Sequence, residues 1–447
     1  MINPTMSQAI DSPAVQAVPR PRVRWNLVEY WVLLVPMLFF AADSNLSPFV
    51  TAANTPMAGA YGTLAESGPG GKIHTLMSLA FYTVITAMML VSWRSILKVS
   101  LQNGIAFALP ILAVMSIAWS QFPGRSALYA VFVLLNTVFA LYLIARFRPD
   151  QQMSLVLLAG AFAIVLSVLL VVAYPRAGID MKEAGGRPWE GIYPHKNVAA
   201  MLTLLLLFPV FSIRIPTIGM RLFRIAYVTF SLALIAMTTS RTGWLLTACL
   251  LPIAMLMPKI RRIHVRDLLL ILLGILTVSA IVVPLVFTYS AEILKMLGKD
   301  PTLTGRTIIW KAVIASAVKR PFLGYGYFAF WNGFNGEAIN TALAAGDPSL
   351  GNAENGILQL WLELGLVGVV ILGLYLFRTC RNAAIAFRAD APRYVDWYVM
   401  ILLFTLFSLV DGGKFFFPHA LYWMLYVMAD AGLAAEARRV KALRLAT

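Results

Sequence analysis

The sequence has few charged residues for its length. Only 13% of the 447 residues are charged, whereas 60% are hydrophobic and the mean hydropathy is +0.78. A water-soluble domain needs more polar sequence to cover its surface, and so does a nucleic-acid-binding protein of similar basicity. The composition therefore excludes most soluble classes and predicts that many side chains face lipid.

Cysteine and histidine are also scarce. Of the two cysteines, Cys249 lies in an apolar run and Cys380 in a basic loop, so we predict no disulfide between them. The four histidines fall in separate segments: His74, His195, His264 and His419. No acidic cluster, phosphate-binding loop or dinucleotide fingerprint is present in the sequence. Chemistry that uses a metal or a cofactor is not supported, and we predict neither.

Long apolar runs recur along the whole chain, and each is long enough for a transmembrane helix. They predict an all-α, polytopic membrane protein of about twelve spans. The predicted spans are Asn26–Ala42, Thr75–Trp93, Gly104–Trp119, Ala127–Ala145, Met153–Tyr174, Asn197–Ile213, Arg224–Thr239, Gly243–Met257, Leu268–Tyr289, Asn355–Phe377, Val395–Val410 and His419–Leu433.

The basic residues predict how these spans are oriented. If both termini are cytoplasmic, the inner segments hold 22 of the 36 Lys and Arg residues, as the positive-inside rule requires. Residues 1–25 and 434–447 then form cytoplasmic tails on a membrane domain of residues 26–433. Residues 175–196 and 290–354 form two long outer loops, the larger between the ninth and tenth spans. Loops of this length exceed simple connectors, so we expect function on the outer face.

The shorter outer loop ends in His195-Lys196-Asn197 before an apolar run. Asn197 is a plausible N-cap, which would place His195, Lys196 and free helix N–H groups together at an anion site. A capped helix with interfacial anchors explains the same pattern. In the next outer turn, Ser240–Gly243, the only charge is Arg241. Its guanidinium matches a diphosphate, although an arginine at the membrane rim also snorkels without binding a ligand.

The larger loop carries further candidates. Arg306 precedes a helical run, Thr307–Lys319, which we expect along the outer membrane surface. Tyr325, Tyr327 and Trp331 alternate with glycine and other aromatic residues, a pattern that suits stacking on sugar rings or an interfacial aromatic belt.

This loop closes at Glu354, next to the tenth predicted span. Asn355, Gln359 and Glu363 are four residues apart and form one polar stripe along a helix, which is expected to face the protein interior. Glu354 at the mouth of this stripe is a candidate general base. Glu354 and Asn355 are also residues that a helix start favours, so a structural role explains both.

Taken in order, several segments resemble the O-antigen ligase and Wzy-type polysaccharide polymerase superfamily, especially its exopolysaccharide polymerase branch. The resemblance covers roughly residues 185–380 and lies in five segments: Gly191–Asn197, Thr239–Thr242, Gly305–Trp310, Pro321–Gly326 and Glu354–Gly368.

The resemblance implies an inverting, metal-independent glycosyltransferase in the bacterial inner membrane. A glycan on undecaprenyl diphosphate would be moved to an acceptor hydroxyl, with a chain-length-regulating co-polymerase as a further partner. It assigns the diphosphate to outer cations, of which Arg241 fits best and Lys196 and Arg306 are further candidates. Asn355 would orient Glu354 or the acceptor.

The sequence departs from the ligase pattern at one position. Ligases carry a histidine where this chain has Glu354, a change that favours a polymerase or moves catalysis elsewhere, for example to His195. Three hypotheses therefore stand: a polymerase of lipid-linked repeats, a ligase acting on lipid A core or protein, and a lipid-linked sugar flippase.

Overall fold

The computed structural model describes residues 27–42, 69–181, 187–213, 217–262, 306–331, 336–348, 350–388, 390–410, 412 and 414–446. These residues are helical apart from turns, loops and two isolated bridges. The helices are α2 (Leu27–Ala41), α5 (Pro69–Val91), α6 (Trp93–Gln102), η2 (Gly104–Phe107), α7 (Ala108–Met115), η3 (Ser116–Ala118), α8 (Pro123–Arg146), α9 (Pro149–Ala173), α10 (Pro175–Gly178), α11 (Lys196–Leu207), α12 (Pro209–Ser212), α13 (Ile218–Met237), α14 (Arg241–Ile260), α16 (Arg306–Ala317), α17 (Glu337–Ala344), α18 (Gly356–Ala386), α19 (Arg393–Val410) and α20 (Leu421–Ala446).

Most of the predicted spans coincide with helices, although not all of these helices are long. Within the described residues, α8, α9, α13, α14, α18 and α19 are long and apolar enough to cross a membrane, and a bent pair raises the number from six to seven. The bend of 88° separates α6 from the end of α5. Shorter apolar helices stand at the first, third and sixth predicted spans, and the ninth, Leu268–Tyr289, lies outside the described residues. The chain is therefore an all-helical, multi-pass membrane protein.

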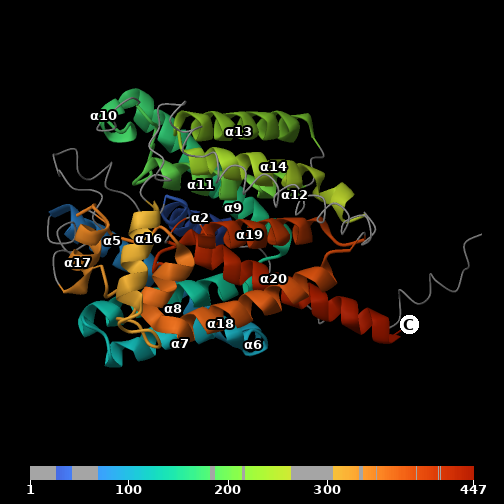
Figure 1. The fold of residues 1–447 in the computed structure, drawn as a ribbon. Coiled ribbons are helices and arrows are strands. Elements are labelled where there is room, and N and C mark those ends of the chain that lie inside the picture. The colour runs from blue at the N-terminus through green and yellow to red at the C-terminus, as the bar shows by residue number, and fades with distance from the viewer. Residues whose placement is uncertain are drawn as a thin grey trace, which may run out of the picture.

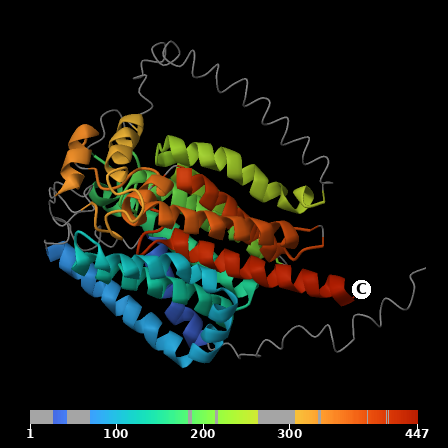
Figure 2. The same cartoon turned by 60° about the horizontal axis from the view of Figure 1, so that its bottom comes forward.

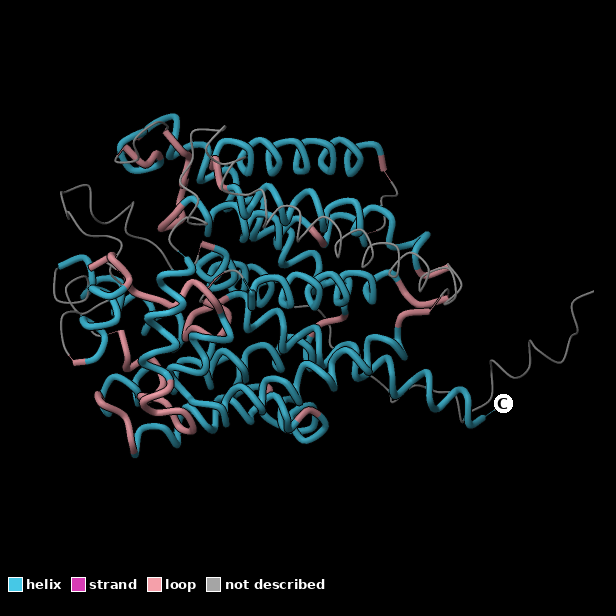
Figure 3. Tube along the Cα trace, viewed as in Figure 1, coloured by secondary structure: helices cyan, strands magenta, loops and turns pink. Residues whose placement is uncertain are grey.

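The long helices run roughly parallel, and their connections gather at two ends of the bundle (Figure 1). Helices α10, α16 and α17 lie together at one end, which we call the loop end, whereas α20 ends at the opposite end. Most of the described loop residues also lie at the loop end (Figure 3). When the molecule is turned, α5 to α8 occupy one side of the bundle next to the central C-terminal helices (Figure 2).

Helix α20 forms the centre of the bundle because its first half is buried on every side and is apolar apart from Asp430 and the hydroxyls of two tyrosines. From Leu421 to Ala431 every side chain is buried, and α20 packs against α8, α18 and α19. A helix that is hydrophobic all round belongs in a protein interior. This half of α20 is therefore the core around which the other helices are arranged.

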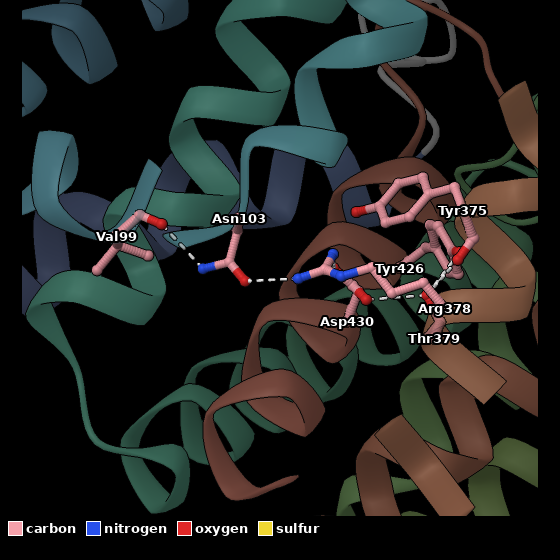
Figure 4. A network of polar contacts seen from close by, with 7 residues as sticks. All are labelled: Val99, Asn103, Tyr375, Arg378, Thr379, Tyr426 and Asp430. Atoms are coloured by element: carbon pink, nitrogen blue, oxygen red, sulfur yellow. Dashed lines mark hydrogen bonds and ion pairs between the residues drawn. The ribbon is translucent and has the colours of Figure 1, made fainter. Parts of the chain in front are cut away.

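A buried ion pair joins α18 to α20 in the interior (Figure 4). Arg378 and Asp430 lie 2.8 Å apart, and the Asp430 carboxylate also accepts a hydrogen bond from Thr379 at 2.9 Å. Asn103, between α6 and η2, accepts from Arg378 at 3.4 Å and donates to Val99. Since a charge in a membrane interior is costly without such partners, these contacts stabilise the buried Asp430 carboxylate.

Helix α18 is interrupted at Gly365, where the backbone is left-handed (φ 67°). The segment Pro321–Gly326 lies across the break and replaces the missing helical hydrogen bonds. The N–H groups of Tyr325 and Gly326 donate to carbonyls of α18 at 3.0 and 2.9 Å. Beyond the break, the N–H of Leu366 donates to the Pro321 carbonyl at 2.8 Å. The loop and the helix thus share one set of hydrogen bonds.

Candidate functional site

The starts of α11 and α14 are joined side by side at the loop end. His195 caps α11, because its Nδ1 accepts a hydrogen bond from the backbone of Asn197 at 3.2 Å. Ser240 caps α14 by accepting from the N–H of Gly243 at 3.1 Å, and its hydroxyl donates to the Asn197 side chain at 2.8 Å. The predicted cap at Asn197 is therefore wrong. Asn197 lies inside the first turn, where its side chain reaches the neighbouring helix instead.

Close packing makes this junction possible. A Cβ added to Gly243 would lie 2.3 Å from the Cβ of Ala200, so only glycine lets α14 approach α11 here. The two helix starts then present their free N–H groups and positive dipole ends together.

A cation is the first residue of each of these helices. Lys196 begins α11, and Arg241 begins α14. The prediction that Arg241 lies in a turn before this helix is therefore wrong. Arg241 is exposed and forms no ion pair with any residue in the described part of the chain. Two cations beside two helix N-termini form a suitable environment for a phosphate or diphosphate.

Glu354 is half-buried, directly before α18, in a left-handed backbone conformation (φ 49°). Asn352 holds it on both sides: the Asn352 amide donates to the Glu354 carboxylate at 3.0 Å, and the Glu354 N–H donates back at 2.7 Å. The strained backbone and the two hydrogen bonds to Asn352 fix the orientation of the Glu354 side chain, as expected for a functional residue.

The side chain of Asn355, which was predicted to orient Glu354 or the acceptor, is committed to backbone groups instead. Its side-chain oxygen accepts from the N–H groups of Ile357 and Leu358, both at 3.0 Å, and its amide donates to the Val410 carbonyl at 3.2 Å. Asn355 is therefore the N-cap of α18, and Asn352 takes the orienting role.

The start of α18 lies at the same end of the bundle as the joined starts of α11 and α14. Asn355 forms a parallel bridge with Gly412, just after α19. A Cβ on Gly412 would lie 3.7 Å from the Met201 side chain of α11. Glu354 and Arg241 thus belong to elements that pack together at the loop end.

Comparison with known proteins shows which family this chain resembles. Residues 225–373 match the family model described as O-antigen ligase. The chain is also 27% identical over 306 residues to the exopolysaccharide production protein ExoQ of Rhizobium meliloti (strain 1021), which covers 67% of this chain and 69% of that protein. Both matches support a relationship to the O-antigen ligase/Wzy-type superfamily. Of the candidates, Arg241, Arg306 and Glu354 lie inside the matched region, whereas His195 and Lys196 precede it.

The predicted polar stripe lies on α18, and its residues Gln359 and Glu363 face inward. Gln359 and Glu363 are each only 3% exposed. The Gln359 amide donates to the Glu363 carboxylate at 2.7 Å, and its oxygen accepts from the N–H of Ala353 at 2.9 Å and from the indole of Trp331 at 3.1 Å.

The three aromatic residues for which the sequence suggested sugar stacking or an interfacial belt are buried instead. Tyr327 is 0% exposed, and its hydroxyl donates to the Phe416 carbonyl at 2.8 Å. Tyr325 donates to the Ser316 carbonyl at 2.9 Å, and burial raises its pKa above the usual value. Since the indole of Trp331 is also committed, these rings pack against protein and offer no open face to a ligand in this structure.

Helix α16 begins at Arg306 and ends at Ala317, one residue earlier at its start and two at its end than the predicted run Thr307–Lys319, and it crosses the loop end (Figure 1). It packs against α17 and α18, and the pairing of Lys319 with Glu337 holds α17 to it. That ion pair also lowers the pKa of the Glu337 carboxyl below its usual value. Arg306 is partly exposed at the start of this element.

Arg125 lies at the loop end, and the sequence analysis did not identify it. Its guanidinium donates to the Phe328 carbonyl at 3.0 Å and lies 5.3 Å from the ring of the same residue. Arg125 lies in the first turn of α8, and Phe328 is 203 positions away in the sequence. The only signal in the sequence was a single charge close to the end of an apolar run. No group of three or more His, Cys, Asp or Glu suited to a metal lies within the described ranges.

Proposed function

We propose that this protein is a membrane glycosyltransferase that polymerises lipid-linked oligosaccharide repeats into an exopolysaccharide or O-antigen-like polymer. The observation that carries the proposal is the pairing of two helix starts, each led by a cation, at the end of the bundle that also holds Glu354. The name of the relative, an exopolysaccharide production protein, supports the polymer class.

In this proposal the donor is a glycan on undecaprenyl diphosphate. Arg241 and Lys196, with Arg306, bind the diphosphate at the joined helix starts. The developing charge on the leaving group is then stabilised by fixed cations and helix dipoles, which is the contribution that a metal ion makes in other enzymes.

Glu354 acts as the general base. It takes the proton of the acceptor hydroxyl as that oxygen forms a bond to the anomeric carbon, and the bond from this carbon to the diphosphate breaks with inversion. His195 suits a different role. With Nδ1 accepting a hydrogen bond, the proton of the neutral imidazole is on Nε2, which donates to a phosphate oxygen rather than accepting a proton.

We place this site on the periplasmic face of the bacterial inner membrane, with both termini in the cytoplasm. The donor and the acceptor are both lipid-linked glycans, and a co-polymerase that sets the chain length is a further partner. The positive-inside distribution supports this orientation.

The assignment predicts that Glu354→Gln and Arg241→Ala each abolish polymer while the protein stays in the membrane. The first variant removes the base, and the second removes charge from the leaving-group site, so we expect turnover to fall about 100-fold or more. Turnover of purified protein on a synthetic undecaprenyl-diphosphate repeat measures this.

Arg262→Ala provides the matched control. Arg262 follows the other end of α14, is exposed like Arg241 and carries the same charge, so its loss is expected to leave turnover unchanged. Full activity in both Glu354→Gln and Arg241→Ala would overturn the site assignment.

A ligase is the second candidate, because the matched family model is described as O-antigen ligase. The two functions differ in what accumulates on the lipid carrier when the gene is deleted. A polymerase deletion accumulates single repeats, whereas a ligase deletion accumulates finished polymer, so the length of the carrier-bound glycan distinguishes them.

A further inference from the structure

A chain of hydrogen bonds runs from inside α18 to the backbone beside Glu354. Gln359 Oε1 accepts from the Ala353 N–H at 2.9 Å, and Ala353 is the residue directly before Glu354. Gln359 Nε2 donates to Glu363 at 2.7 Å. Both polar atoms of this buried side chain are therefore engaged.

The orientation of the Gln359 amide is fixed by its partners. Trp331 and Ala353 both present N–H donors, so only the amide oxygen can face them, and the amide nitrogen must face Glu363. Glu363 in turn accepts from the backbone of Phe328. Buried polar groups of this kind act as a unit, because leaving any one of them unpaired is destabilising.

The helix itself does not need this contact. Asn355 already caps α18 by accepting from the N–H groups of Ile357 and Leu358. The bond from Gln359 instead holds the N–H of Ala353 and so fixes the backbone that leads into Glu354, where a φ of 49° is costly for a residue with a side chain. Without this bond, the backbone at Glu354 would relax toward negative φ and turn the carboxylate away from its present direction.

We propose that Gln359 is a positioning residue for the transfer reaction, and that Glu363 acts with it by setting the direction of its amide. Gln359 holds Ala353 so that Glu354 keeps its left-handed conformation and its carboxylate faces the acceptor. This role rests on the proposed function, in which Glu354 is the general base.

The test exchanges the two side chains. Gln359→Glu places a second carboxyl against Glu363 and removes the donor between them. We expect kcat to fall about 10- to 100-fold, because misplacing a reacting group by about 1 Å has this effect. The dissociation constant for the diphosphate lipid donor should not change, because the cations of α11 and α14 are untouched.

Adding Glu363→Gln to Gln359→Glu restores one donor and one acceptor in the pair. The new glutamine can donate to the carboxylate at position 359 and accept from Phe328, so we expect kcat to return to within about 3-fold of the original value. Gln359→Met keeps the approximate volume without the hydrogen bonds and is expected to show the same loss as Gln359→Glu.

Gln152→Glu is the matched control for a purely structural effect. Gln152 is also buried, donates to the carbonyls of Leu143 and Phe147, and accepts from Tyr398. It lies on α9 away from the loop end. We expect this variant to lower the melting temperature while kcat per folded protein stays unchanged.

Three results would overturn the inference. The first is an unchanged kcat in Gln359→Glu, and the second is a changed affinity for the lipid donor with kcat intact. The third is a double variant, Gln359→Glu with Glu363→Gln, that folds but does not recover kcat. The proposed function fails separately. If Glu354→Gln turns over normally, the base assignment is lost. If Glu354→Gln is inactive while Gln359→Glu and Gln359→Met are fully active, only the positioning role is lost.

Discussion

At the scale of single residues, Glu354 has a conformation that opposes stability. A residue with a side chain at φ 49° costs about 1–2 kcal/mol relative to right-handed backbone. Such strain persists only where surrounding contacts impose it, here the two hydrogen bonds to Asn352 and the Gln359 bond to Ala353. A residue present only to start a helix would not require this conformation.

Glu354→Gly therefore separates stability from activity. Glycine adopts this φ without strain, so the melting temperature is expected to stay the same or to rise by an amount equivalent to about 1 kcal/mol, while turnover is lost. Thermal unfolding in detergent and the polymer assay measure the two effects. Loss of stability with retained turnover would show that Glu354 serves the fold alone.

At the scale of elements, the break in α18 depends on a single glycine. A Cβ on Gly365 would lie 2.0 Å from the Phe322 carbonyl oxygen, and φ there is 67°. Gly373, further along α18, has nothing within 4 Å of an added Cβ. The same substitution therefore has opposite consequences at two positions of one helix.

Gly365→Ala is expected to lower the unfolding free energy by about 2–4 kcal/mol, since it adds both a steric overlap and backbone strain. Gly373→Ala is expected to be neutral or stabilising by up to about 1 kcal/mol, because alanine suits a helix interior better than glycine. Melting temperatures of the two variants in the same detergent measure the difference. Equal shifts would contradict the role of the break.

The elements that could be predicted from the sequence are those determined by neighbouring residues. Apolar runs predicted the helices, and the spacing of four residues predicted that Gln359 and Glu363 face inward. The break at Gly365 could not be predicted, because it depends on a segment distant in sequence. The cap of α11 was placed at Asn197 instead of His195 for a similar reason, since Ser240 on another helix decides where the Asn197 side chain points. The burial of Tyr327 likewise depends on Phe416.

At the scale of the whole molecule, the candidate site and the C-terminal helix end lie at opposite ends of the bundle (Figure 1). Glu29 at the start of α2 pairs with Arg146 at the end of α8, at 2.8 Å, so the first described helix also starts opposite the loop end. Under the proposed orientation, these two ends of the bundle face opposite sides of the membrane.

Cysteine labelling measures this sidedness. Once the exposed Cys249 and Cys380 are replaced by Ser, Leu343→Cys introduces a thiol at the loop end and Leu445→Cys one at the opposite end. We expect a membrane-impermeant maleimide added to spheroplasts to label the first variant and to label the second only after lysis. Labelling of Leu445→Cys in intact spheroplasts would reverse the proposed orientation.

The shared hydrogen bonds between Pro321–Gly326 and α18 also limit how proteins of this kind diversify. An amide of one stretch matches a carbonyl of the other at four places, on both sides of Gly365. A recombinant that took the loop from one relative and the helix from another would have to preserve every one of these matches. The two stretches are therefore expected to be exchangeable only together, as one inherited unit.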